Sequence, residues 1–131
     1  MVDFRVSRQR VLQRPNPPCY MPIIAEAVLH NQVGGDPKIM RAQIRRLAEA
    51  AGLDHADLRV LPRTASEYLW FGSPQLLISL RPPGRLTVSV VDQYAQNLFV
   101  EDEEKVAAHE ETFELLLSAA LNRTASLKII R

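Results

Sequence analysis

Two residues four positions apart, Glu26 and His30, are candidates for acid–base chemistry. Residues at this spacing face each other on a helix, so the carboxylate can orient the imidazole. Asp92 and Tyr94 follow a predicted strand and can add a second carboxylate and a phenol to such a set. The structural alternative for Glu26 and His30 is a surface ion pair, which stabilises a protein little. If the protein is an enzyme, these four residues are its predicted catalytic groups.

A second group of residues indicates binding rather than catalysis. Tyr68, Trp70 and Phe71 bring three aromatic side chains together in a segment that we predict to be a loop. Aromatic anchors dominate pockets and interfaces, so the segment predicts a surface for a ligand or a partner, with burial in the domain's own core as the alternative. The polar residues expected beside this surface are Glu67, Asp92 and Tyr94.

The remaining reactive residues do not form a known motif. His30, His55 and His109 are scattered along the sequence, and neither a zinc motif nor a nucleophile elbow nor a phosphate loop is present. His109 lies on the apolar stripe of a predicted helix, which favours a packed histidine over a catalytic one. Cys19 is the only cysteine, which excludes an intrachain disulfide. We therefore predict no metal ion and no cofactor.

Composition places the chain among ordinary globular proteins. Its 131 residues are 47% hydrophobic and 24% charged, with a net charge of +1, which excludes a disordered chain and lacks the excess of a dedicated nucleic-acid binder. The apolar runs are far shorter than the roughly 20 residues of a membrane helix, and no signal peptide is visible, so we expect a cytoplasmic protein. Residues 1–63 carry ten basic and six acidic groups, whereas residues 64–131 carry six and nine. This division suits docking or self-association.

Periodicity and helix-breaking residues outline the elements that must position these groups. Asp36 and Pro37 begin the clearest helix, and Gly52 ends it. Prolines and a glycine at 82–84 favour a hairpin. Helices are predicted at 5–14, at 36–51, from Asp102 as a cap to residue 120, and from Thr124, and strands at 19–25, 58–61, 75–80, 85–91 and 97–100. We expect one α+β domain over residues 1–131, with a four- to five-stranded, mostly antiparallel sheet packed by two main helices.

A series of short phrases is specific as a set and covers nearly the whole chain. The phrases are Arg8-Gln9 with Val11-Leu12, Glu26-Ala27 with Leu29, Val33-Gly34-Gly35, Met40-Arg41-Ala42-Gln43, Val60-Leu61-Pro62, Val100-Glu101-Asp102, Ala119-Ala120-Leu121 and Ile129-Ile130. In this order they resemble the C-terminal domain of actinobacterial XRE-type helix-turn-helix regulators, the WhiJ-like regulators of development and antibiotic production. The resemblance implies an effector domain that receives a signal and passes it to a DNA-binding domain.

The resemblance also sets expectations about partners. Such regulators carry a helix-turn-helix and a leucine-rich segment before this part, and we expect this chain to lack both. Specific DNA binding by the chain alone is therefore not expected, whereas a homo-oligomer that covers the exposed apolar surface is. The leading hypothesis is a non-enzymatic domain that binds a small molecule or a protein partner. The alternative is a small biosynthetic enzyme with an aromatic-walled pocket and the four acid–base residues named above.

Overall fold

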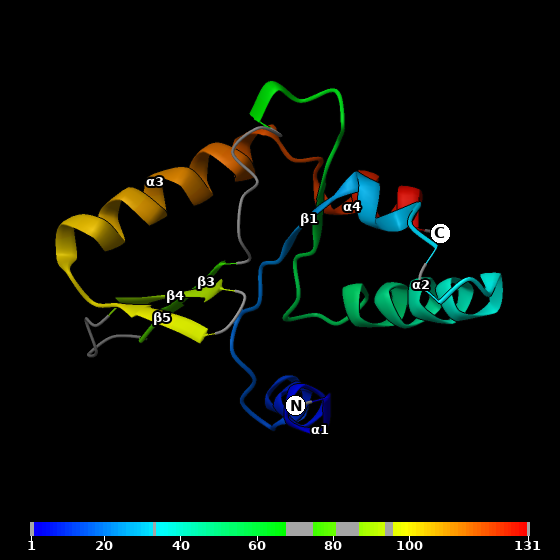
Figure 1. The fold of residues 1–131 in the computed structure, drawn as a ribbon, viewed down its shortest axis with the longest axis horizontal. Helices are drawn as coiled ribbons and strands as arrows, with labels where there is room; N and C mark the ends of the chain where they lie inside the picture. Colours follow the sequence, from blue (N-terminus) through cyan, green and yellow to red (C-terminus); the bar gives the residue numbers. More distant parts are fainter. Residues whose placement is uncertain (1, 33, 68–74, 81–86, 94–95, 131) are drawn as a thin grey trace. The chain divides into compact units, whose positions relative to one another are not determined.

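The first and last segments of the chain fold together, and the residues between them form a separate unit. This computed structural model describes residues 2–32, 34–67, 75–80, 87–93 and 96–130. Unit 1 comprises Met1–Arg63 and Ala120–Arg131, and unit 2 comprises Thr64–Ala119. Figure 1 shows the elements of both units, which are described one at a time below.

Unit 1 is organised around a two-stranded parallel sheet. Strand β1 (Ile23–Ala25) pairs with β2 (Arg59–Leu61), with Ile24 opposite Val60. Parallel neighbours need a long crossover, which here contains helical elements. The helices of unit 1 are α1 (Val2–Arg8), α2 (Pro37–Ala51) and α4 (Arg123–Ile130), with the 3-10 helices η1 (Gln9–Gln13) and η2 (Glu26–Leu29).

The core of unit 1 joins α2, β2 and α4. Ala51, Leu58, Val60 and Ile130 are buried together, and the half-buried side chains of α2 pack against them. Asp36 caps α2 as expected, because its Oδ1 accepts a hydrogen bond from the main-chain N–H of Lys38 at 2.9 Å. Two glycines before this cap, Gly34 and Gly35, take positive φ angles of 74° and 72°. The chain reversal that delivers α2 to the sheet therefore depends on glycine.

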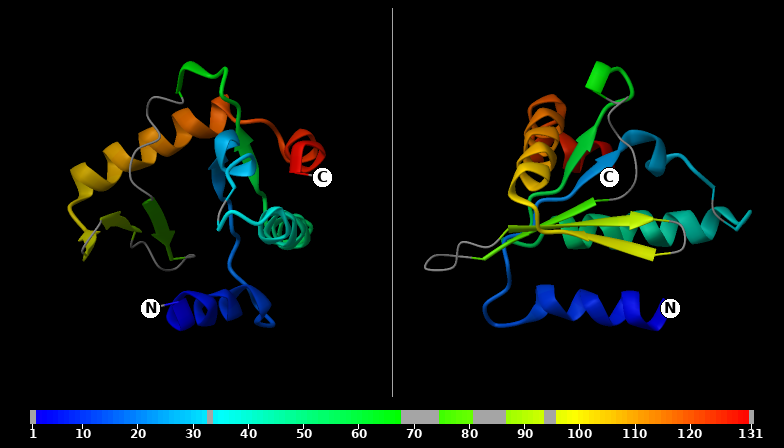
Figure 2. Two further views of the ribbon diagram at one scale, coloured as in Figure 1. Left: turned by 45° about the vertical axis from the view of Figure 1, so that its right-hand side comes forward. Right: turned by 60° about the vertical axis from the view of Figure 1, so that its left-hand side comes forward.

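Unit 2 is an antiparallel sheet with one long helix. Its strands β3 (Gln75–Ser79), β4 (Thr87–Gln93) and β5 (Gln96–Val100) lie in the order β3-β4-β5. Helix α3 (Glu103–Ala119) packs against β4, and the two views of Figure 2 show it on one side of the sheet. Asp102 caps this helix through a 3.1 Å hydrogen bond from the Lys105 N–H to its Oδ1, as the sequence predicts.

The two faces of this sheet differ in cover. Leu77 and Val100 lie opposite Ser89 in the strand register, and this is the face that meets α3. The other face presents Leu76, Ile78 and Phe99, whose exposed fractions are 42%, 48% and 66%. Unit 2 therefore has an apolar sheet face that the described residues leave exposed.

The α+β class is confirmed, with three corrections to the expected elements. The five strands of the described residues divide between two sheets, because β1 and β2 pair in parallel through a helical crossover instead of joining the antiparallel strands. The helix expected over 5–14 begins at Val2 and becomes 3-10 from Gln9 to Gln13. The strand expected over 19–25 is limited to Ile23–Ala25, following Pro22, although Tyr20 forms an isolated bridge with Ala56.

Charge follows the boundary between the units more closely than it follows the halves of the sequence. Unit 1 contains thirteen basic and six acidic residues, and unit 2 contains three basic and nine acidic residues. The net charges are therefore +7 and −6. Each unit by itself therefore has an excess of charge of one sign, and the two excesses nearly cancel in the net charge of +1 of the whole chain.

Candidate functional site

A cavity of about 440 Å³ lies within unit 1. Its walls come from η1, the segment before β1, the second half of α2 and the residues that lead into β2. The lining residues are Gln9, Leu12, Gln13, Tyr20, Pro22, Ile24, Gln43, Arg46, Leu47, Glu49, Ala50, Ala51, Leu53, Ala56 and Leu58. This volume falls within the range of small-molecule sites, about 300 to 1,000 Å³.

The floor of the cavity is apolar and fixed by main-chain hydrogen bonds. Ala51, Ala56 and Leu58 line it and are at most 5% exposed. Tyr20 is held beside them, because its N–H donates to the carbonyl of His55 at 2.9 Å and its carbonyl accepts from the N–H of Asp57 at 2.8 Å. The floor is thus positioned by backbone pairing rather than by side-chain packing alone.

Polar side chains gather among the more exposed lining residues. Gln9 and Gln13 come from η1, and Gln43 comes from α2; all three are exposed. Arg46 and Glu49 form an ion pair with 3.5 Å between Nη1 and Oε2. The cavity therefore combines an apolar floor with amide groups and one compensated pair of charges, an arrangement typical of ligand sites.

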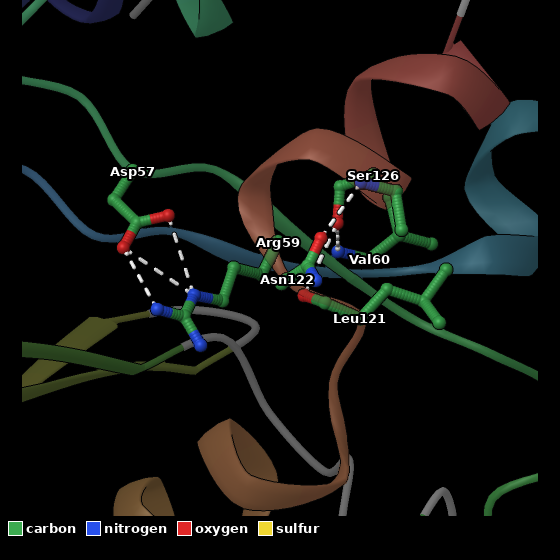
Figure 3. Close-up of polar contacts among 7 residues, drawn as sticks. Asp57, Arg59, Val60, Leu121, Asn122 and Ser126 are labelled. Atoms are coloured by element: carbon green, nitrogen blue, oxygen red, sulfur yellow. Dashed lines mark hydrogen bonds and ion pairs between the residues drawn. The ribbon is translucent and has the colours of Figure 1, made fainter.

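Helix α4 is tied to both β2 and the end of α2. The Val60 carbonyl accepts from the Leu121 N–H at 2.9 Å, and the Val60 N–H donates to Ser126 Oγ at the same distance (Figure 3). Arg123 Nη2 donates to the carbonyls of Ala51 and Leu53, at 3.4 and 3.0 Å. Because Ala51 and Leu53 both line the cavity, α4 contacts the walls of the site through one guanidinium group.

An ion pair joins Arg59, the first residue of β2, to Asp57 just before the strand. Arg59 holds Asp57 through three hydrogen bonds of 3.0 to 3.3 Å, shown in Figure 3. Hydrogen bonding to Asp57 raises the pKa of Arg59 above its ordinary value, so the guanidinium stays charged. Both side chains remain about 30% exposed, and such pairs stabilise a fold only modestly.

Unit 2 contains a part-buried polar network in which Ser89 of β4 contacts one side chain of β3 and one of α3. Gln75 Nε2 donates to Ser89 Oγ at 3.0 Å, and His109 Nδ1 lies 2.7 Å from the same oxygen. The hydroxyl of Ser89 therefore joins a side chain of β3 to a side chain of α3. Ser89 is fully buried, so a substrate cannot reach this oxygen without rearrangement of the fold. The network ties α3 to the sheet, in agreement with the predicted packing role of His109.

Glu26 and His30 lie together as their spacing predicts, although Glu26 begins the 3-10 helix η2 and His30 follows its last residue. Their Oε1 and Nε2 atoms are 4.0 Å apart, and the His30 side chain is 57% exposed. The other carboxylate oxygen of Glu26 accepts from the Arg63 N–H at 2.8 Å. This carboxylate therefore also holds the main chain at Arg63, just after the end of β2. A catalytic role for the two residues stays a prediction.

Most of the predicted aromatic surface lies outside the described residues. This applies to Tyr68, Trp70, Phe71 and Tyr94. Glu67 is half-buried and accepts a 3.1 Å hydrogen bond from Ser66. The backbone of Asp92 pairs with Asn97, because β4 continues two residues past its predicted end at Val91. The binding role of this set stays a prediction.

Sequence reasoning missed the cavity because its walls come from separate segments. Leu12 and Leu47 were recognisable as inward positions of their helices, but nothing in their spacing indicates that η1 and α2 enclose a space. The useful signal was the run of prolines between η1 and β1. Such a break turns the chain back toward its own sheet, where Tyr20 then pairs with Ala56.

Metal and membrane sites are not found within the described part of the chain. Among those residues, no group of three or more His, Cys, Asp or Glu side chains is arranged to hold a metal ion. None of the described helices combines the length and the apolar character needed to cross a bilayer.

The fold and the cavity define a small α+β domain with a ligand-sized site. A family model described as Domain of unknown function (DUF5753) matches residues 1–131, so the chain belongs to the DUF5753 family. No curated protein and no solved structure matches it.

Proposed function

We propose that this protein is a signal-receiving domain that binds a small molecule in the cavity of unit 1. The observation that carries the proposal is the combination of ligand-sized volume, an apolar floor and polar groups among its exposed lining residues. Among the described lining residues, the ionisable groups are Tyr20, Arg46 and Glu49, and the two charged ones compensate each other. The lining therefore favours binding over acid–base catalysis.

Arg123 supplies a route by which occupancy can be sensed. Its guanidinium group donates to the carbonyls of Ala51 and Leu53 at the end of α2. The chain passes from α3 into unit 1 just before Arg123. A ligand that presses on Ala51 or Leu53 changes the position of the acceptors that hold Arg123. Coupling of this kind requires that the ligand bind two arrangements of α4 with different affinity.

The resemblance to WhiJ-like XRE-type regulators supports the same proposal at a finer level. In that setting the domain receives the signal, and specific DNA binding belongs to a helix-turn-helix elsewhere. The opposite net charges of the two units favour association with a protein partner, of which a second copy is the simplest. The alternative function, a small biosynthetic enzyme, depends on the predicted aromatic surface.

Binding is tested with the neutral fluorescent probe N-phenylnaphthylamine, whose emission rises in an apolar site. We expect saturable binding with one probe for each chain and a dissociation constant in the micromolar range, which corresponds to about −8 kcal/mol. Native mass spectrometry of the protein isolated under mild conditions then asks whether a natural ligand is retained. Absence of saturable binding would overturn the assignment of the cavity.

A further inference from the structure

We propose that the ligand of the unit 1 cavity is an uncharged molecule with a predominantly apolar body and a hydrogen-bonding polar end. This inference rests on the proposed function and names the chemical class that the site selects. It follows from how charge, amide groups and apolar surface are distributed over the lining.

The floor selects the apolar body. Ala51, Ala56 and Leu58 are 1%, 5% and 4% exposed and present only carbon atoms in their side chains. A charged or strongly polar group placed against them loses its hydration without gaining a partner, at a cost of several kcal/mol. An apolar group placed there instead gains about 25 cal/mol for each Å² removed from water.

The charged lining residues do not select an ion. Arg46 and Glu49 lie one helical turn apart on α2, and their 3.5 Å ion pair leaves no net charge at this part of the cavity. Their side chains are 58% and 60% exposed, so water weakens the small field that the pair leaves, whereas one of these charges without its partner keeps a larger field. An anion near Arg46 is attracted by its guanidinium group and repelled by the neighbouring carboxylate of Glu49. A cation near Glu49 is attracted by the carboxylate and repelled by the guanidinium group.

Amide groups select the polar end. Gln9, Gln13 and Gln43 come from two elements, η1 and α2, and remain exposed while lining the cavity. A primary amide both donates and accepts hydrogen bonds, so it can pair with a hydroxyl, an amide or a carbonyl group. A neutral polar end therefore finds partners here, whereas a full charge finds only partial compensation.

The test compares three unbranched ten-carbon probes whose head groups are neutral, anionic and cationic. Decanol, decanoate and decylammonium compete with N-phenylnaphthylamine for the wild-type cavity, each below the concentration at which it self-associates. We expect decanol to displace the probe at a concentration about tenfold lower than either ion, equivalent to about 1.4 kcal/mol. Decanoate or decylammonium binding as tightly as decanol would overturn the inference while leaving the cavity assignment intact.

Two variants that remove one charge each sharpen the comparison. Glu49→Gln leaves Arg46 uncompensated, so decanoate should gain about fivefold in affinity; Arg46→Gln should give decylammonium a similar gain. Arg45→Gln removes an exposed charge from the same helix outside the cavity lining and serves as the matched control, with unchanged preferences. Unaltered preferences in both lining variants would contradict the role given to the ion pair. Failure of all three probes and of the fluorophore would instead overturn the proposed function itself.

Discussion

Val60 in β2 and Ser126 in α4 are separated by 66 residues, yet the N–H of Val60 donates to Ser126 Oγ at 2.9 Å. Both residues are fully buried. Ser126 Oγ also donates to the Leu121 carbonyl at 3.3 Å, so one hydroxyl accepts from the strand and donates to the turn before α4. This hydrogen bond connects α4 to β2 of the two-stranded sheet.

Replacing this hydroxyl should destabilise unit 1. Ser126→Ala leaves the buried N–H of Val60 without an acceptor, which costs about 1 to 3 kcal/mol. Urea denaturation measures the loss. Ser118→Ala is the control, since Ser118 is exposed and bonds only within its own helix, and it should change stability by less than about 0.5 kcal/mol. Equal effects of the two substitutions would contradict the account of α4.

Two adjacent glycines provide a second test of unit 1. Both have positive φ, so Gly34→Ala and Gly35→Ala should each destabilise the protein by about 1 kcal/mol. A Cβ atom at Gly34 also lies 2.9 Å from Ile39 Cδ1, the free end of an exposed side chain that must then shift, whereas one at Gly35 has no neighbour within 4 Å. The Gly34 variant should therefore have the lower urea midpoint. The reverse order would show that the turn before α2 is packed differently.

Arg123 tests the link between the cavity and α4. Arg123→Met keeps an unbranched side-chain stem but removes the guanidinium group and with it the hydrogen bonds to the carbonyls of Ala51 and Leu53. Hydrogen exchange measured with and without bound N-phenylnaphthylamine should show ligand-dependent protection of α4 in the wild type and much less in this variant. Protection of α4 that does not respond to the ligand in the wild type would remove Arg123 from the signalling route.

The exposed sheet face of unit 2 predicts self-association. Phe99 is 66% exposed and shares this face with Leu76 and Ile78. Apolar patches of this kind mark interfaces, so Phe99→Ser should weaken association in sedimentation experiments at micromolar concentration. Lys128→Ser, an exposed substitution in unit 1, is the control. A wild-type protein that remains monomeric throughout this range would contradict the prediction.

Local signals in the sequence predicted local structure well. Asp36 and Asp102 were recognised as helix caps, and both accept the expected main-chain hydrogen bonds. Ser89 and Ser126 were not recognised, because an isolated serine in a strand or helix is usually exposed. Their burial depends on partners far away in the chain, Ser89 on His109 and Ser126 on Val60. Spacing within one element cannot reveal such pairs.

The candidate site was harder to predict for the same reason. Reactive residue types directed attention to Glu26, His30 and the aromatic segment, whereas the cavity is built mainly from alanine, leucine and glutamine. These residues carry no chemical signature of their own, and only the meeting of η1, α2 and the Tyr20 bridge makes them a site. Trp70 remains a predicted binding residue of the second surface.

The most direct test of the central claim fills the cavity from α2. Ala50 lines the cavity and Ala42 is an exposed residue of the same helix outside the lining, so Ala50→Phe and Ala42→Phe add the same ring at matched positions. The quantity measured is the dissociation constant of N-phenylnaphthylamine, with circular dichroism to verify that both variants are folded. We predict that Ala50→Phe weakens binding at least about tenfold and that Ala42→Phe leaves it unchanged. Equal binding by the folded Ala50→Phe variant and the wild type would contradict the assignment of this cavity as the ligand site.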